Sequence, residues 1–184
     1  MPYVITEHFE ELAHGAPETV ELELIEGRLR EKPPRDGDHG AILQWLLRRC
    51  REQRPALGLF LLPGLRVGTD PPSRLRPDGF LAPLGHFAGR REWHPADGGL
   101  MAVEVSSFRP GDPRDRRAKR RAYARAGVPV QVFVDRRGRR VVVHSDPASG
   151  DYRRRTSHAY GASLRLPDPV GVTLDTERLK NYAR

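Results

Sequence analysis

The chain has 184 residues, of which 38% are hydrophobic and 30% are charged, a composition that accommodates a single domain over residues 1–184. Its formal net charge of +8 favours a polyanionic partner. No apolar run approaches the roughly 18 residues of a membrane span, and no signal-peptide pattern opens the chain, so we expect a cytoplasmic protein with no membrane partner.

A short helix and a β-hairpin are the first predicted elements. Thr6 is a suitable N-cap for the helix. Residues 20–25 then alternate between apolar and acidic side chains, which predicts a strand, and Gly27 offers a turn into a second strand over residues 28–32. Glu23 lies on the polar face of the first strand. It is a candidate third acid near a metal, although acids that alternate along a strand are usually solvated.

The strongest helix pattern covers residues 39–53, where apolar side chains recur at helical spacing after Asp38, a suitable N-cap. Cys50 is the only cysteine, which excludes an intrachain disulfide and a cysteine-ligated metal site, and its helical position predicts a buried thiol. His39 stands in the first turn. A histidine there is commonly structural, but it could also accept or donate a proton near a site.

Short apolar runs broken by Gly and Pro predict the remaining strands. Between two of them, residues 83–98 are expected to form a loop, in which Arg91 and Trp93 are candidates for contacts with phosphate or a base. Strands before and after two main helices predict the α/β (α+β) class, with a mixed β-sheet flanked by helices. The predicted strands cover residues 57–62, 65–67, 76–82, 100–106, 128–135, 140–145 and 152–155.

A basic helix is predicted over residues 114–126, ended by Gly127. Between Arg109 and Arg125 there are eight basic residues and two aspartates, a local net charge of +6. Such a surface suits a phosphate backbone, and Arg116 and Arg120 are its candidate nucleic-acid contacts. The alternative is a solvated helix face in a chain whose basic residues are nearly all arginine.

Two acids and a lysine form the candidate catalytic set. Asp78 starts a predicted strand, and Glu104 interrupts the apolar run over residues 101–105. Lys119 lies on the helix that follows, and it is one of three lysines among 32 basic residues, the other 29 being arginine. Two carboxylates on adjacent strands can hold Mg²⁺ or Mn²⁺, and a nearby ammonium can position a water against a phosphodiester. The trio therefore predicts metal-assisted phosphodiester hydrolysis.

Each of these residues also has a simpler structural explanation. The Pro-Asp-Gly sequence at Asp78 is an ordinary turn signature, and Glu104 would fit the polar face of an edge strand. Asp115 lies four residues before Lys119 and Tyr123 lies four residues after it, so all three share one helix face. On that face, Asp115 and Lys119 could form a surface ion pair, and Tyr123 could be a core aromatic residue.

These motifs together resemble the Uma-type family described as "putative restriction endonuclease", a branch of the PD-(D/E)XK nuclease superfamily, and the resemblance runs over most of the chain. The matching motifs are Glu23-Leu-Ile-Glu-Gly27, His39, Pro77-Asp78, Val103-Glu-Val105 with Ser107, Asp115-Arg116 with Lys119 and Tyr123, Gly127-Val-Pro129, and Val134-Asp135.

The resemblance implies a restriction-endonuclease-like core, a mixed β-sheet flanked by helices, with a metal site at Asp78 and Glu104. In the parent pattern, the lysine lies two residues after the second acid, on the same strand. Ser106 occupies that position here, and the resemblance implies that Lys119 on the next helix takes over the role of the lysine.

The sequence thus favours a Mg²⁺-dependent or Mn²⁺-dependent endonuclease that hydrolyses DNA phosphodiester bonds, and a homodimer is one form in which it could cut both strands. A catalytically inactive nucleic-acid-binding or regulatory module on the same fold is the alternative, with salt-sensitive binding and no turnover. A phosphohydrolase that acts on RNA or small nucleotides could use the same residues.

Overall fold

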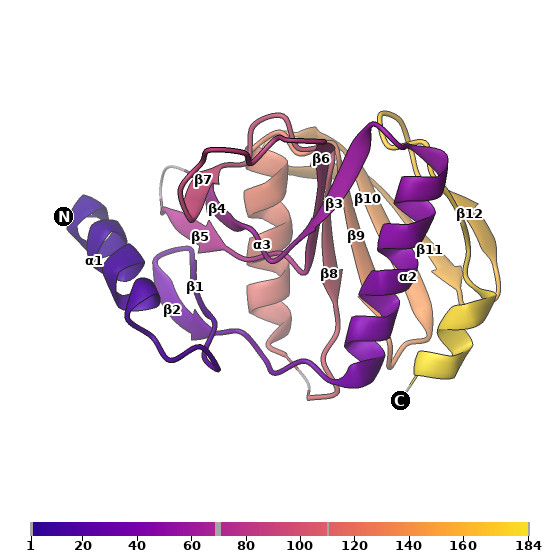
Figure 1. The fold of residues 1–184 in the computed structure, drawn as a ribbon, viewed down its shortest axis with the longest axis horizontal. Coiled ribbons are helices and arrows are strands. Elements are labelled where there is room, and N and C mark those ends of the chain that lie inside the picture. Colours follow the sequence, from indigo (N-terminus) through magenta and orange to yellow (C-terminus); the bar gives the residue numbers. More distant parts are fainter. Residues whose placement is uncertain (1, 69–70, 110, 184) are drawn as a thin grey trace.

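Three α-helices and two large β-sheets organise the computed structural model, which describes residues 2–68, 71–109 and 111–183 (Figure 1). Among these residues, every helix is too short or too polar to span a membrane. The helices are α1 (Pro2–His14), α2 (Gly37–Gln53) and α3 (Pro113–Arg125), and a short 3-10 helix, η1 (Glu177–Tyr182), follows the last strand.

The larger sheet has six strands and is mixed. Strand β8 pairs with β9 in parallel, and all the other pairs of neighbouring strands in this sheet are antiparallel. The parallel pair requires a crossover connection, and α3 provides it. In spatial order the strands are β11 (Asp151–Ala159), β10 (Arg140–Ala148), β9 (Val130–Asp135), β8 (Met101–Val105), β6 (Gly79–Pro83) and β3 (Leu57–Leu61).

The second sheet has five strands and lies beside α3, and a small two-stranded sheet lies near the C-terminal end. The five strands are, in spatial order, β2 (Arg28–Glu31), β1 (Leu22–Ile25), β5 (Ser73–Leu75), β4 (Gly64–Val67) and β7 (Trp93–Pro95). The two-stranded sheet pairs β12 (Ser163–Arg165) with β13 (Thr173–Asp175).

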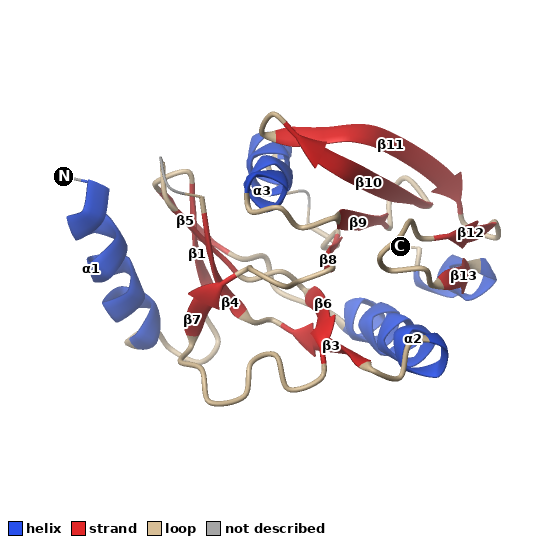
Figure 2. Cartoon of the chain, turned by 90° about the horizontal axis from the view of Figure 1, so that it is seen from above, coloured by secondary structure: helices blue, strands red, loops and turns tan. Residues whose placement is uncertain are grey.

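Helices α2 and α3 cover opposite faces of the six-stranded sheet, as the view from above shows (Figure 2). Alternation along β8 produces this division, because successive side chains of a strand point to opposite faces. Met101 and Val103 pack in the core cluster that contains the apolar face of α2, whereas Ala102 packs with Tyr123 of α3. Glu104 shares the parity of Ala102, so its carboxylate points toward α3.

The helix ends have local causes in the sequence. Asp36 caps α2 by accepting a 2.8 Å hydrogen bond from the backbone N–H of His39. Asp112 caps α3 by accepting a 2.8 Å hydrogen bond from Arg114 N, and Pro113 suits the first helical turn. After α3, Gly127 adopts a φ of 74°, the left-handed conformation that ends helices.

The predicted fold class is confirmed, because a mixed sheet is flanked by helices.

Several local predictions were wrong. Asp36 rather than Asp38 caps α2, and α1 begins at Pro2, so Thr6 lies inside the helix. The strand expected from residue 76 begins at Gly79. The expected loop over residues 83–98 contains β7, since β4 offers it a parallel partner. Trp93 on β7, a candidate for contacts with phosphate or a base, is buried and packs against Phe9.

Candidate active site

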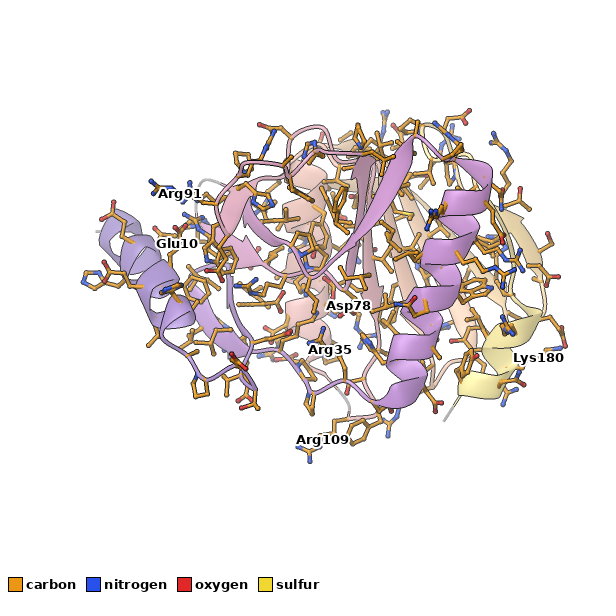
Figure 3. The ribbon with its side chains drawn as sticks, viewed as in Figure 1. Glu10, Arg35, Asp78, Arg91, Arg109 and Lys180 are labelled. Atoms are coloured by element: carbon orange, nitrogen blue, oxygen red, sulfur yellow. The ribbon has the colours of Figure 1, made fainter. Side chains whose placement is uncertain are left out.

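A cavity of about 460 Å³ lies where the two sheets meet the first turns of α2 and α3. Its walls come from segments that are distant in sequence: β1, the segment after β2, the start of α2, the end of β8, β9 and α3. Glu23, Asp78, Glu104 and Lys119 all line it, together with His39. The structure therefore brings both predicted acids and the predicted lysine to one place. Figure 3 shows Asp78 near the centre of the molecule, between α2 and α3.

Glu104 is the meeting point of the cluster. Lys119 Nζ lies 2.6 Å from Glu104 Oε1, and Tyr123 Oη donates a 2.6 Å hydrogen bond to the same oxygen. The strand that carries Glu104 lies between β9 and β6, so it is central, whereas the alternative explanation required an edge strand. A glutamate at this place needs partners because burial of an unpaired charge is costly, and α3 supplies two of them.

Asp78 lies in the bend directly before β6 and is 1% exposed. Its Oδ2 accepts a 2.7 Å hydrogen bond from the backbone N–H of Val105 and lies 3.3 Å from His39 Nε2. Burial opposes ionisation, but the ammonium of Lys32 and the hydrogen bonds at Oδ2 outweigh it and hold the pKa of Asp78 well below its ordinary value. Asp78 is therefore an ionised carboxylate at neutral pH.

Glu23 contacts Lys119 from the opposite sheet. Its Oε1 lies 2.8 Å from Lys119 Nζ and accepts a 2.8 Å hydrogen bond from Arg76 N. Although the alternating pattern suggested a solvated face, the side chain of Glu23 points inward and is 3% exposed. Burial alone would raise the pKa of Glu23, but the ammonium groups of Lys119 and Lys32 lower it by a larger amount. The pKa of Glu23 therefore lies below its ordinary value.

Lys32 is the residue that reasoning from the sequence missed. It follows β2, and its buried side chain places Nζ 3.0 Å from Asp78 Oδ1 and 3.5 Å from Glu104 Oε2. Burial disfavours the charged ammonium, but the carboxylates of Asp78 and Glu104 more than compensate and raise the pKa of Lys32. The rarity of lysine was the sequence signal that could have identified Lys32, since two of the three lysines in this arginine-rich chain line the cavity.

Two residues predicted as secondary support the acids. His39 is 2% exposed and faces Asp78, while its Nδ1 is a buried nitrogen without a hydrogen-bond partner among the described residues. Tyr123 is fully buried. Burial is the larger cause that raises the pKa of its hydroxyl, and the negative charge of the nearby Glu104 carboxylate is the second. The phenol therefore remains a hydrogen-bond donor to Glu104, and it is also the core aromatic residue of the alternative explanation.

The structure places the two candidate arginines of α3 differently. Arg116 lines the cavity, and its guanidinium lies 4.7 Å from the centre of the Phe133 ring. Arg120 instead makes a bidentate pair with Asp151, with hydrogen bonds of 2.8 and 2.6 Å, and it is not part of the cavity lining. Asp115 does not pair with Lys119, because it accepts a 2.7 Å hydrogen bond from Arg30 across the cavity.

The donor set of the cavity fits a hard divalent cation. Asp78 Oδ1 is buried, and its contact among the described residues is the ion pair with the Lys32 ammonium at 3.0 Å. The two carboxylates converge on the point that the Lys32 ammonium occupies. Proteins commonly hold Mg²⁺ by one or two carboxylates, with water and phosphate oxygens as further ligands. No group of three or more His, Cys, Asp or Glu side chains forms a metal site in the described residues.

The sequence and the fold of the chain are similar to those of known proteins. Residues 6–177 match the family Uma2, described as "Putative restriction endonuclease". The fold is similar to a crystal structure of a "putative nuclease" from Anabaena variabilis, with a TM-score of 0.74, 16% sequence identity, and coverage of 98% of each chain. No curated protein matches the sequence.

Proposed function

The chain belongs to the Uma2 family of "Putative restriction endonuclease" proteins, and we propose that it is a Mg²⁺-dependent or Mn²⁺-dependent deoxyribonuclease of the PD-(D/E)XK type. The observation that carries the proposal is the contact between Lys119 and Glu104, in the cavity that also contains Asp78. In this function, residues 1–184 act as one cytoplasmic domain.

In this proposal, Asp78 and Glu104 would hold the cation. When bound, the cation would supply charge neutralisation at the scissile phosphate and favour ionisation of the attacking water. Both carboxylates are held in fixed orientations by the protein, Asp78 by Val105 N and Glu104 by Tyr123 Oη. Because these partners are set by the fold, little reorganisation is needed at the moment of reaction.

Lys119 performs the second part of the chemistry. Its ammonium donates a hydrogen bond to the attacking water or to a phosphoryl oxygen, and so stabilises the negative charge that develops as the new P–O bond forms and the leaving P–O bond breaks. Glu23 acts as the third acid by orienting Lys119 from the opposite side, at 2.8 Å. His39 supports Asp78, and we assign it a positioning role.

The basic face of α3 is the proposed path of the DNA backbone. Arg116 at the cavity wall is the first candidate for a phosphate contact, and Arg120 is the second, with its charge partly neutralised by Asp151. A homodimer would bring two cavities to one duplex, so the ratio of nicked to linear product measures how the two strands are cut.

The direct test is cleavage of supercoiled plasmid DNA with Mg²⁺ or Mn²⁺ by the wild-type chain and by isosteric variants. Asp78→Asn and Glu104→Gln should each lower the rate by about 10²-fold or more, because each removes one negative charge from the cation site. Lys119→Met should lower the rate by a similar factor. Circular dichroism and thermal melts establish that each variant is folded.

A matched lysine and glutamate pair outside the cavity provides the control. Glu177 and Lys180 form an ion pair at 2.8 Å on η1, and Figure 3 shows Lys180 at the edge of the molecule, far from Asp78. Glu177→Gln and Lys180→Met should cut at the wild-type rate. Undiminished cutting by both Asp78→Asn and Glu104→Gln would refute the catalytic assignment.

The rival functions give different outcomes in the same assay. An inactive binding module would retain DNA in a salt-sensitive manner and release no product with either cation. A hydrolase of RNA or small nucleotides would leave duplex DNA intact and cut single-stranded RNA or release phosphate from nucleotides. A panel of duplex DNA, single strands and nucleotides therefore separates the three functions.

A further inference from the structure

Lys32 stands between the two carboxylates that the proposed function assigns to the cation. Its Nζ lies 3.0 Å from Asp78 Oδ1 and 3.5 Å from Glu104 Oε2, so a single ammonium bridges both acids. No contact between Lys119 and Asp78 exists among the described residues, because Lys119 reaches Glu104 from the other side, at Oε1. The two lysines therefore have different geometric roles at the same glutamate.

The bridge is built into the fold. The side chain of Lys32 is 6% exposed, and its backbone N–H donates a 2.7 Å hydrogen bond to Glu21 O, which fixes the segment after β2 against the residue that precedes β1. An exposed lysine would make such contacts only transiently, because its ion pairs are screened and its side chain loses entropy. A buried lysine at this position is a persistent counter-ion.

The charge of the cluster explains why a counter-ion is needed. Glu23, Asp78 and Glu104 contribute three negative charges, and Lys32 and Lys119 contribute two positive charges, and ion pairs of 2.6–3.5 Å link the five groups in one chain. Without Lys32 the net charge of the other four groups would be −2, which a divalent cation matches. With Lys32 it is −1, and a cation that entered while the ammonium stayed would bring like charges together.

We propose that Lys32 is an internal counter-ion that occupies the bridging position between Asp78 and Glu104 in the metal-free protein, and that a divalent cation binds by displacing its ammonium. The inference rests on the proposed function for the identity of the cation ligands. Lys32 thereby stabilises the folded protein without metal, by pairing with both carboxylates, and sets the affinity for the cation. The displaced ammonium remains beside the cavity, since Lys32 is part of its wall.

The test measures Mn²⁺ binding to the full chain by isothermal titration calorimetry and by the electron paramagnetic resonance signal of free Mn²⁺. Lys32→Met should bind Mn²⁺ about tenfold or more tightly than the wild-type chain, because an ammonium at this separation is worth at least that factor even when partly screened. Lys32→Arg, which keeps the positive charge, should bind no more tightly than the wild-type chain.

Lys119→Met is the matched control, because it removes the same charge from the same cluster without opening the bridging position. Lys32→Met should bind Mn²⁺ more tightly than Lys119→Met, and adding Asp78→Asn to Lys32→Met should abolish the gain. In EDTA, Lys32→Met should melt at a lower temperature than the wild-type chain, and saturating Mn²⁺ should remove the difference. If Lys32→Met is unfolded in EDTA, recovery of its circular dichroism on Mn²⁺ addition provides the same measurement.

The outcomes separate this inference from the nuclease proposal. Mn²⁺ binding by Lys32→Met that is no tighter than that of the wild-type chain, or of Lys119→Met, overturns the counter-ion role even if the wild-type chain cuts DNA. Tighter binding by Lys32→Met with no DNA cleavage by any chain supports the counter-ion role and overturns the nuclease proposal. If neither the wild-type chain nor Lys32→Met binds Mn²⁺, the counter-ion role and the nuclease proposal are both overturned.

Discussion

Tyr123 Oη donates a 2.6 Å hydrogen bond to Glu104 Oε1, the oxygen that Lys119 also contacts. Three features of the chain produce this contact: Glu104 points to the α3 side of β8, Lys119 and Tyr123 are four residues apart on α3, and both face the sheet. The phenol thus fixes the carboxylate without adding charge, and the orientation of Glu104 depends on a residue of the core.

Removal of this single hydroxyl should slow catalysis while the ring continues to fill the core. We expect Tyr123→Phe to lower the DNA cleavage rate by roughly tenfold, because Glu104 loses its orienting donor, and to cost about 1–2 kcal/mol in the free energy of unfolding. Tyr152→Phe is a suitable control, since Tyr152 is also buried and donates a 2.8 Å hydrogen bond to Val128 O, away from the cavity. It should lose similar stability and retain the cleavage rate. Equal rates for the two variants would contradict the positioning role.

The two arginines of α3 should contribute unequally to DNA binding. Arg116→Ala should weaken binding of the metal-free chain and reduce the slope of log K against log salt by about 1, because one phosphate contact is lost. Arg120→Ala should have a smaller effect, since Asp151 already neutralises much of its charge through two hydrogen bonds. Fluorescence anisotropy at several salt concentrations measures both. A larger loss for Arg120→Ala would place the DNA path elsewhere.

His144 should make the fold sensitive to mild acid. It is 8% exposed, and Nδ1 lies 2.8 Å from Gln131 Oε1. Burial, together with the nearby positive charge of Arg120, lowers the pKa of His144 to about 4. An unfolded histidine titrates near pH 6.5, so the unfolded chain binds a proton first as the pH falls, and stability contributed by neutral His144 is lost between about pH 6.5 and 4.

The size of this effect is on the order of 1–3 kcal/mol, since each unit of pKa difference corresponds to about 1.4 kcal/mol. Urea unfolding at pH 7 and pH 4.5 should show a smaller difference in His144→Gln than in the wild-type chain. His14, whose side chain is 86% exposed, provides the control, and His14→Gln should behave as the wild-type chain does. An unchanged pH dependence in His144→Gln would show that other groups cause the acid sensitivity.

Two glycines should respond in opposite directions to the same substitution. A Cβ at Gly99 would overlap the ring of Phe80, which is completely buried, so Gly99→Ala should destabilise the fold by about 2 kcal/mol or more. Gly40 lies on the exposed side of α2, where an added Cβ would meet no atom within 4 Å, so Gly40→Ala should stabilise by about 0.5–1 kcal/mol. Chemical denaturation measures both, and similar stabilities would contradict the close packing at Gly99.

Patterns among neighbouring residues predicted the elements that form through local interactions. The helical spacing of apolar residues identified α2, and the basic run ended by Gly127 identified α3. The strand β7 was missed because it has only three residues and exists through its pairing with β4. Burial of Trp93 has the same origin, since Phe9 of α1 and Arg76 cover its ring from distant parts of the chain.

The sequence by itself determined the mixed helix and strand class, the family, and which residue types could perform phosphodiester chemistry. The class and the residue types follow from periodicity, turn residues and the placement of acids and of the rare lysines, each of which is readable over a short stretch of chain, whereas the family follows from the resemblance of the motifs to known sequences. Only the tertiary structure decided that Glu23 is buried against Lys119 and that Lys32 bridges Asp78 and Glu104. These contacts join two sheets, and whether a polar side chain is solvated or paired depends on what packs against its face, which no local pattern records.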